Sequence, residues 1–185
     1  LSQVLNSGSQ AVTLAGAGNA TGGRFDIDTT LASVLSGLLV PKNVTAIQSA
    51  ANLNVTGSLT NSGNYYALSQ SLKQATDSIN ATSILNNAGA LISSVLPKSI
   101  SNSYKATAGV NLTLSALNGI VNAGTISSAK DLNLVSLNVT NSGLLQSVAG
   151  NVNFTSGAPG SMTINNQGGQ IQAQSGSINV HDAAF

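Results

Sequence analysis

The feature that most constrains this fold is a phrase that recurs about every 20 residues in the second half of the chain. The stretch "VNLTLSALNGIVNAG" (Val110 to Gly124) returns as "DLNLVSLNVTNSG" (Asp131 to Gly143), with Leu112, Leu132 and Val152 each 20 positions apart. A catalytic motif normally occurs once, whereas a phrase that recurs with drifting letters describes a structural unit. The repeat therefore predicts architecture before it predicts chemistry.

Each copy of the phrase alternates apolar and polar residues. In "VNLTLSA" the apolar Val110, Leu112 and Leu114 are separated by polar residues, which predicts a short strand with one apolar face. The same alternation places these pairs on one face: Leu132 and Leu134, Leu137 and Val139, Val152 and Phe154, Met162 and Ile164, Ile178 and Val180. Every run ends in a cluster rich in Asn and Gly, which predicts a turn.

A period near 20 residues predicts an all-β fold, a parallel β-helix or β-solenoid, in which each strand pairs with its equivalent one coil later. A propeller blade would need roughly 40 to 45 residues. An antiparallel sandwich is the alternative, but it has no reason to repeat at a fixed period. A uniform period would give about nine coils and a rod on the order of 45 Å long.

Specific positions in each coil follow from this fold. In the coil from Asp131 to Gly143 we expect inward side chains at Leu132, Leu134, Leu137 and Val139, and outward side chains at Asn133 and Asn138. The corner turns are predicted at Asn61, Gly63, Asn122, Gly124, Asn141 and Gly143. Gly and Asn accept tight or left-handed corners, and stacked Asn side chains can hydrogen-bond along the axis.

The first half of the chain is less regular. Helical spacing of apolar residues predicts short helical excursions near residues 30–40, 68–80 and 90–96. We therefore expect one solenoid domain over residues 1–185, with irregular coils over 1–107 and regular coils over 108–185.

Composition excludes several classes of function. Only 6% of residues are charged, against roughly 25% in ordinary globular proteins, and Ser and Asn take their place. A net charge of +1 with scattered Lys and Arg predicts no nucleic-acid partner. Without Cys there is neither a disulfide nor a Cys-based metal site, and no apolar run is long enough for a membrane span. Because the chain begins at Leu1 with no leader, we expect a processed protein or an excerpt.

An enzyme acting on polysaccharides is the rival interpretation, and it would need paired carboxylates. Only "RFDIDTT" brings two together: Asp26 and Asp28 would share a strand face with Arg24 and form a weak cation or sugar site. An outward-facing polar strand explains them better. His181 and Asp182 fit a terminal surface, so no catalytic residue, metal site or cofactor is predicted.

Seven Asn residues stand two positions before a Thr, at Asn19, Asn43, Asn54, Asn80, Asn111, Asn138 and Asn153. Such sequons accept N-linked sugars in secreted proteins. They also arise by chance in strands that alternate Asn and Thr, and some would lie on buried positions. The sequence leaves both alternatives open.

The phrases "AGVNLTLSALNGIVNAGTISS" (Ala108 to Ser128), "AKDLNLVSLNVTNSGLLQS" (Ala129 to Ser147) and "ANLNVTGSLTNSG" (Ala51 to Gly63) resemble the repeats of filamentous-haemagglutinin-type proteins and related large bacterial surface adhesins. The resemblance is best from Ala108 to about Val180. It implies a right-handed β-helical rod that is exported through an outer-membrane partner and works as a surface fibre or adhesin. The chain departs from the pattern in its helical segments and in lacking the Asn-Pro-Asn signatures of the secretion domain, which puts the export route in doubt.

The leading functional hypothesis is a non-catalytic structural segment of an extracellular bacterial surface fibre or adhesin. Its expected partners are neighbouring repeats or copies of itself end to end, and surface glycans. The alternative is a self-assembling subunit of a homopolymeric extracellular filament, joined end to end by β-augmentation.

Overall fold

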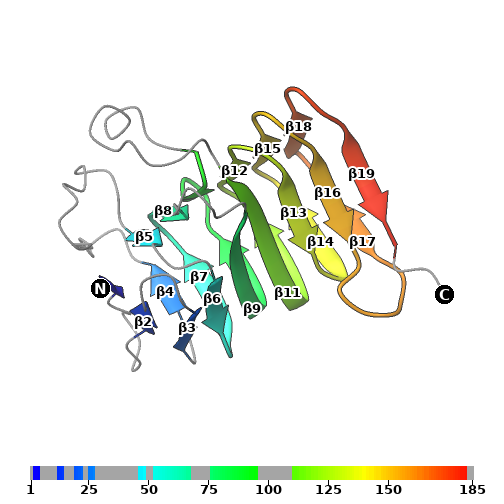
Figure 1. Ribbon diagram of the computed structural model, residues 1–185. Helices are drawn as coiled ribbons and strands as arrows, with labels where there is room; N and C mark the ends of the chain where they lie inside the picture. The colour runs from blue at the N-terminus through cyan, green and yellow to red at the C-terminus, as the bar shows by residue number, and fades with distance from the viewer. Residues whose placement is uncertain are drawn as a thin grey trace.

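The computed structural model describes residues 2–4, 12–14, 19–22, 25–27, 46–48, 52–67, 76–95 and 110–182, the first five ranges as backbone only. All of its described elements are β-strands, stacked one after another from the N-terminal to the C-terminal end (Figure 1). This is a parallel β-solenoid, as the repeat predicts. No described helix is long and apolar enough to cross a membrane.

Each coil contributes strands to three faces. Face 1 contains β3 (Asn19–Gly22), β6 (Asn52–Val55), the first part of β9 (Thr76–Asn86), the first part of β11 (Asn111–Asn122), β13 (Leu132–Val135), β16 (Val152–Thr155) and β19 (Ile178–His181). Face 2 contains β4 (Phe25–Ile27), β7 (Ser58–Asn61), the second parts of β9 and β11, β14 (Asn138–Asn141) and β17 (Thr163–Asn165). Face 3 contains β5 (Ala46–Gln48), β8 (Asn64–Ala67), β10 (Leu91–Ser93), β12 (Thr125–Ser128), β15 (Leu144–Ser147) and β18 (Gln170–Ala173). Because β9 and β11 run across the corner between faces 1 and 2, those faces form one 13-stranded sheet, and face 3 is a separate six-stranded sheet.

The N-terminal edge of face 1 departs from parallel pairing. There β1 (Ser2–Val4) pairs antiparallel with β2 (Val12–Leu14), and β2 pairs antiparallel with β3. All other strand pairs in the described residues are parallel. Two reversals leave β1 running in the same direction as β3, so the edge strand of this face points the same way as β19 at the other end.

The register confirms the 20-residue period where the sequence is regular. Leu112 pairs with Leu132, which pairs with Val152. Elsewhere the period is longer: residues paired across coils lie 26 apart between β6 and β9, 35 apart between β9 and β11, and 26 apart between β16 and β19. The prediction of nine uniform coils is therefore wrong, and the seven parallel strands of face 1 from β3 to β19 span about 30 Å at ~4.8 Å per step.

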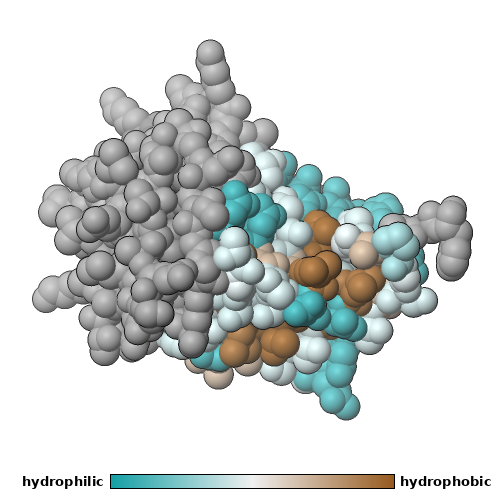
Figure 2. Space-filling model, turned by 90° about the horizontal axis from the view of Figure 1, so that it is seen from below, coloured by the Kyte–Doolittle hydropathy of each residue, from teal (hydrophilic) through white to brown (hydrophobic). Residues whose placement is uncertain are grey.

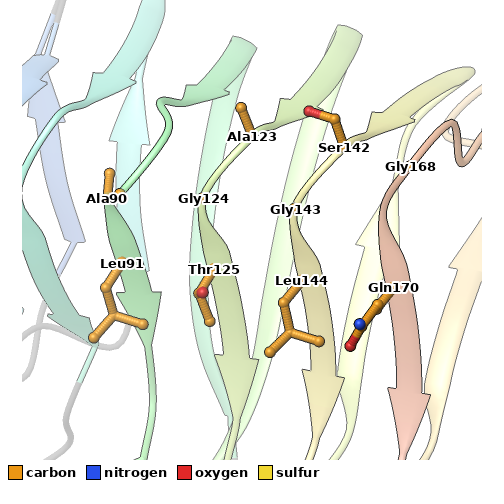
Figure 3. A pocket seen from close by; sticks show the side chains of 11 residues that line it. Ala90, Leu91, Ala123, Gly124, Thr125, Ser142, Gly143, Leu144, Gly168 and Gln170 are labelled. Atoms are coloured by element: carbon orange, nitrogen blue, oxygen red, sulfur yellow. The ribbon is translucent and has the colours of Figure 1, made fainter.

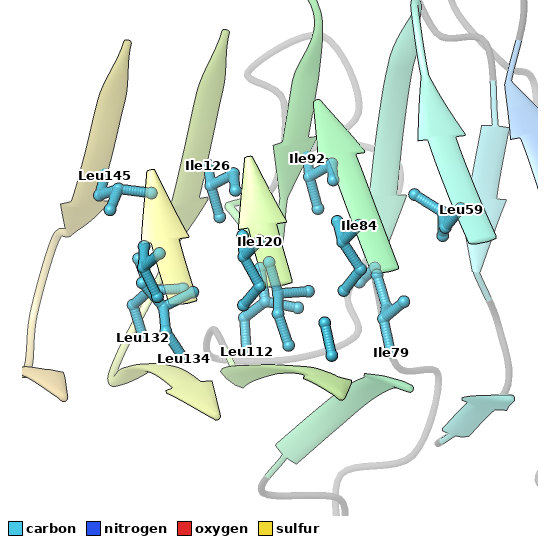
Figure 4. Packing of buried hydrophobic residues seen from close by; sticks show 14 of the residues in the cluster. Leu59, Ile79, Ile84, Ile92, Leu112, Ile120, Ile126, Leu132, Leu134 and Leu145 are labelled. Carbon is cyan, nitrogen blue, oxygen red and sulfur yellow. The ribbon is translucent and has the colours of Figure 1, made fainter. Parts of the chain in front are cut away.

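The core consists of apolar side chains stacked in register from coil to coil. On face 3, Ile92, Ile126 and Leu145 lie one above another, and on faces 1 and 2 the ladders contain Leu112 with Leu132 and Ile84 with Ile120 (Figure 4). All are buried. Each coil covers the apolar side chains of the coil before it, so stability depends on stacking.

Two of the predicted helical excursions are wrong within the described residues. Residues 76–80 begin strand β9, in which Asp77 and Ile79 are buried on alternate positions, and Leu91–Ser93 forms β10. Both strands pair with parallel neighbours on either side, so ladder hydrogen bonds and burial override local helical spacing. Residues 30–40 and 68–75 lie outside the described residues.

One inward position was also assigned wrongly. Ser136 is fully buried, whereas Leu137 is only half-buried. The Ser136 hydroxyl donates to the Ala116 carbonyl at 2.8 Å, one coil earlier. At the corner between faces 1 and 2 the buried position holds a small hydroxyl that satisfies a backbone carbonyl, and Leu137 stays partly exposed.

Candidate functional site

A column of asparagines lies inside the corner between faces 2 and 3. We call it the asparagine ladder, and it consists of Asn61, Asn86, Asn122, Asn141 and Asn166. Each amide nitrogen donates to the side-chain oxygen of the next Asn, at 2.8 Å for the first pair and 2.7 Å for the other three. The expected hydrogen bonding along the axis is therefore present over five coils.

The ladder also serves the backbone. The Asn122 amide donates to the Leu144 carbonyl of the next coil at 3.1 Å, and Asn86 and Asn141 donate in the same way to Thr125 and Gln170. The first four members of the ladder are fully buried. A buried carbonyl without a donor costs about 1–3 kcal/mol, so the ladder stabilises a corner where the strands of two faces diverge.

The ladder has a direction, because every amide donates toward the C-terminal end. At its start the Asn61 side-chain oxygen accepts from the Gly63 N–H at 3.2 Å, and the register position before it is Ile27. At its end Asn166 is exposed and donates to the Gly169 carbonyl of its own turn at 3.2 Å.

The predicted corner glycines act through close approach. Positive φ angles occur at other described glycines, among them Gly89 and Gly168, and not at Gly124 or Gly143. A Cβ on Gly124 would overlap with the carbonyl oxygen of Ala90, and one on Gly143 with that of Gly124. Glycine is needed at these two corners because consecutive coils touch there, and the left-handed backbone expected from the sequence is not the reason.

The stacked glycine turns leave a shallow groove on the outside of the same corner, with a volume of about 590 Å³ (Figure 3). It runs across four coils, and its polar side chains are Thr125, Ser142 and Gln170 beside the apolar Leu91 and Leu144. No charged or titratable side chain lines it. The groove offers hydrogen bonds and apolar contact to a neutral ligand, and it offers no group for acid–base chemistry.

The acidic residues are dispersed. Asp26 lies in β4, paired in register with Thr60, but its side chain and the whole of Asp28 lie outside the described part. The Asp131 carboxylate accepts from the Asn151 N–H one coil later at 2.7 Å, so it supports stacking. Within the described residues no group of three His, Cys, Asp or Glu side chains is arranged to hold a metal ion.

Sequence reasoning missed one buried polar pair. Asp77 is fully buried at the register position of Leu112, and Tyr65 is fully buried on face 3. Burial, and secondly the charge of Asp77, raise the pKa of Tyr65 well above its ordinary value. The sequence did carry a signal for the buried Asp77. Asp77 and Ile79 are two positions apart, so in a strand both lie on the inward side.

The outer surface carries hydrogen-bonded polar columns as well. On face 1, Asn179 donates to Asn153 and Asn153 donates to Asn133, both at 2.8 Å. Exposed apolar side chains gather in small groups between polar ones on the side shown in Figure 2. At the C-terminal end Ile178 and Val180 are 50% and 58% exposed although they pair with the buried Val152 and Phe154. Among the described residues these two form the open end of the coil stack.

Comparisons of the chain with protein-family models, with curated proteins and with solved structures gave no match.

Proposed function

We propose that this chain is a non-catalytic structural segment of an extracellular bacterial surface fibre or adhesin. The observation that carries the proposal is the asparagine ladder, which joins five successive coils through side chains of which the first four are buried. A continuous buried hydrogen-bonded column suits a rod whose task is to keep its length and shape.

The chemistry of the surface supports the same role. In the described part the outward columns are amides and hydroxyls, such as Asn133 and Asn153, and the groove at the glycine corner is uncharged. A surface of this kind stays hydrated without attracting charged molecules. It suits contact with neutral surface glycans through hydrogen bonds.

Localisation tests this proposal. Antibodies against the chain should label the surface of intact cells of the source bacterium in immunogold electron microscopy, and external protease should remove the label without lysis. A label confined to the cytoplasm, and protected from external protease, would contradict the proposal.

The second candidate is a self-assembling filament subunit joined end to end. The C-terminal end of the described stack favours it, because Ile178 and Val180 occupy inward positions and no described strand stacks on them. At the opposite edge of face 1, β1 runs in the same direction as β19, so a second copy could add to the sheet in parallel.

A matched pair of variants tests end-to-end assembly. Val180→Lys places a charge in the proposed contact, and Asn179→Lys places the same charge on the outward side of the same strand. If the subunit polymerises, the wild type and Asn179→Lys form filaments under the electron microscope and Val180→Lys does not. Isolated rods of one length at every concentration would rule this candidate out.

A further inference from the structure

The Asn-x-Thr sequons of the described part differ sharply in how their side chains are held. Three of these asparagines use the amide nitrogen as a donor to a neighbouring coil: Asn80 to Asn54, Asn111 to Thr76, and Asn153 to Asn133, at 2.8, 3.5 and 2.8 Å. The Asn54 side-chain oxygen accepts the first of these bonds. All four side chains are only partly exposed and belong to outer columns.

Asn138 is the exception. It is exposed at the start of β14, and among the described residues no hydrogen bond holds its side-chain amide. Thr140 is exposed as well, while Val139 between them is fully buried. Because side chains alternate along a strand, Asn138 and Thr140 point to the same outer side, as a sequon must be presented.

The neighbouring coil leaves room beside Asn138. In the column of face 2, the position before Asn138 is Gly119, where a Cβ would lie 3.6 Å from the Asn138 Cβ. With glycine there, the register neighbour of Asn138 in that coil has no side chain to cover it, and in the next coil the register partner is the exposed Thr163. Beside Thr140 the register partner is Val121, which is 43% exposed and gives an apolar surface beside the sequon.

We propose that Asn138 is a site of N-linked glycosylation, and that the folded solenoid excludes the sequons at Asn80, Asn111 and Asn153. The donor is a nucleotide-activated or lipid-activated sugar. The amide nitrogen of Asn138 attacks the anomeric carbon, the C–N bond forms as the bond to the phosphate leaving group breaks, and the amide loses one proton to the transferase. The apolar side of the sugar ring then covers Val121.

The selectivity follows from the hydrogen bonds. To react, Asn80, Asn111 or Asn153 would have to lose a hydrogen bond that its side-chain amide donates to the neighbouring coil. Asn138 loses no such hydrogen bond. A sugar on one of those three would also separate consecutive coils. The outer columns of face 1 therefore protect their sequons, and the gap at Gly119 exposes the one on face 2.

Peptide mapping by mass spectrometry of the protein purified from its source tests the proposal. A sugar mass on the peptide that contains Asn138, with bare peptides at Asn80, Asn111 and Asn153, is the expected result. An unmodified Asn138 overturns the proposal, and so does a sugar on Asn80, Asn111 or Asn153.

A second measurement separates the sequon from its fold. Recombinant folded chain is incubated with an N-glycosyltransferase of broad sequon tolerance and its sugar nucleotide, and incorporation is compared with that of Asn138→Gln and Asn153→Gln. Incorporation summed over the peptides that contain Asn80, Asn111, Asn138 and Asn153 should fall at least about tenfold in Asn138→Gln and stay unchanged in Asn153→Gln. Equal incorporation in the two variants would show that the fold does not select Asn138. Urea-unfolded chain, in which all sequons are free, serves as the positive control for the enzyme.

Discussion

Replacing Asn122 by Asp tests the asparagine ladder with almost no change in shape. The Asn122 amide nitrogen lies 2.7 Å from the Asn141 side-chain oxygen, and 3.1 Å and 3.3 Å from two backbone carbonyl oxygens. In Asn122→Asp an acceptor oxygen takes the place of this donor, so three favourable contacts become oxygen–oxygen contacts. The site is fully buried, so solvent does not screen them.

The magnitude follows from the loss of these donors. Leaving a buried charge without compensation costs about 3–5 kcal/mol, and this comes on top of acceptors left without a donor. A domain of ordinary stability has about 5–15 kcal/mol in total, so the variant should approach unfolding at neutral pH. The measurement is the free energy of unfolding from urea titration followed by circular dichroism.

The sign of the pH dependence is fixed by the same contacts. Oxygens around residue 122 disfavour the charged carboxylate, so the pKa of the introduced Asp is raised in the folded state above its unfolded value of about 3.9. The folded state therefore binds more protons than the unfolded state above that pH, and stability falls as pH rises. The penalty of Asn122→Asp should be smaller near pH 4 than near pH 7.

Asn138→Asp is the control, because the same change is made on an exposed Asn whose amide donates no hydrogen bond in the described structure. It should alter stability by less than about 0.5 kcal/mol. Equal losses for Asn122→Asp and Asn138→Asp at neutral pH would refute the reasoning. So would a loss for Asn122→Asp that does not depend on pH.

Three further predictions concern the glycine corners, the buried tyrosine and the open end. Gly143→Ala should destabilise the fold by about 3 kcal/mol in urea unfolding, because the added Cβ overlaps with backbone of the preceding coil. Stability should decline above pH ~10, where the unfolded chain loses a tyrosine proton that buried Tyr65 keeps, and Tyr65→Phe should flatten this decline by up to ~1.4 kcal/mol per pH unit. Leu132→Ala should cost about 2–5 kcal/mol in the core, whereas Ile178→Ala at the open end should cost under about 1 kcal/mol.

Controls for these predictions are available in the chain. At Gly89 nothing lies within 4 Å of an added Cβ, and a loss for Gly89→Ala should stay near ~1 kcal/mol from its φ of 76° alone. If Gly143→Ala cost no more than that, close approach would not be the reason for glycine at the corner. An unchanged alkaline slope in Tyr65→Phe would mean that Tyr65 does not carry the effect, and an Ile178→Ala loss as large as that of Leu132→Ala would mean that the end is covered in solution.

The sequence by itself determined the regular coils. Over residues 110–155 its apolar alternation predicted which side chains point inward, except at Ser136 and Leu137, and its 20-residue period predicted the pairing of Leu112 with Leu132 and Val152. It also predicted that Asn side chains would bond along the axis. These properties are local and repeated, so each copy of the phrase carries the same information as the next.

Tertiary structure decided the rest. Residues 76–80 and 91–93 have short runs that fit a helix. Each lies between two strands whose backbone groups need a partner, so both segments form strands and pair with those neighbours. Coil lengths of 26 and 35 residues left no fixed period to read. The role of Gly143 was equally invisible, because the carbonyl that excludes a Cβ belongs to the preceding coil. A contact between coils depends on which residues stack, and in an irregular region only the folded chain specifies that.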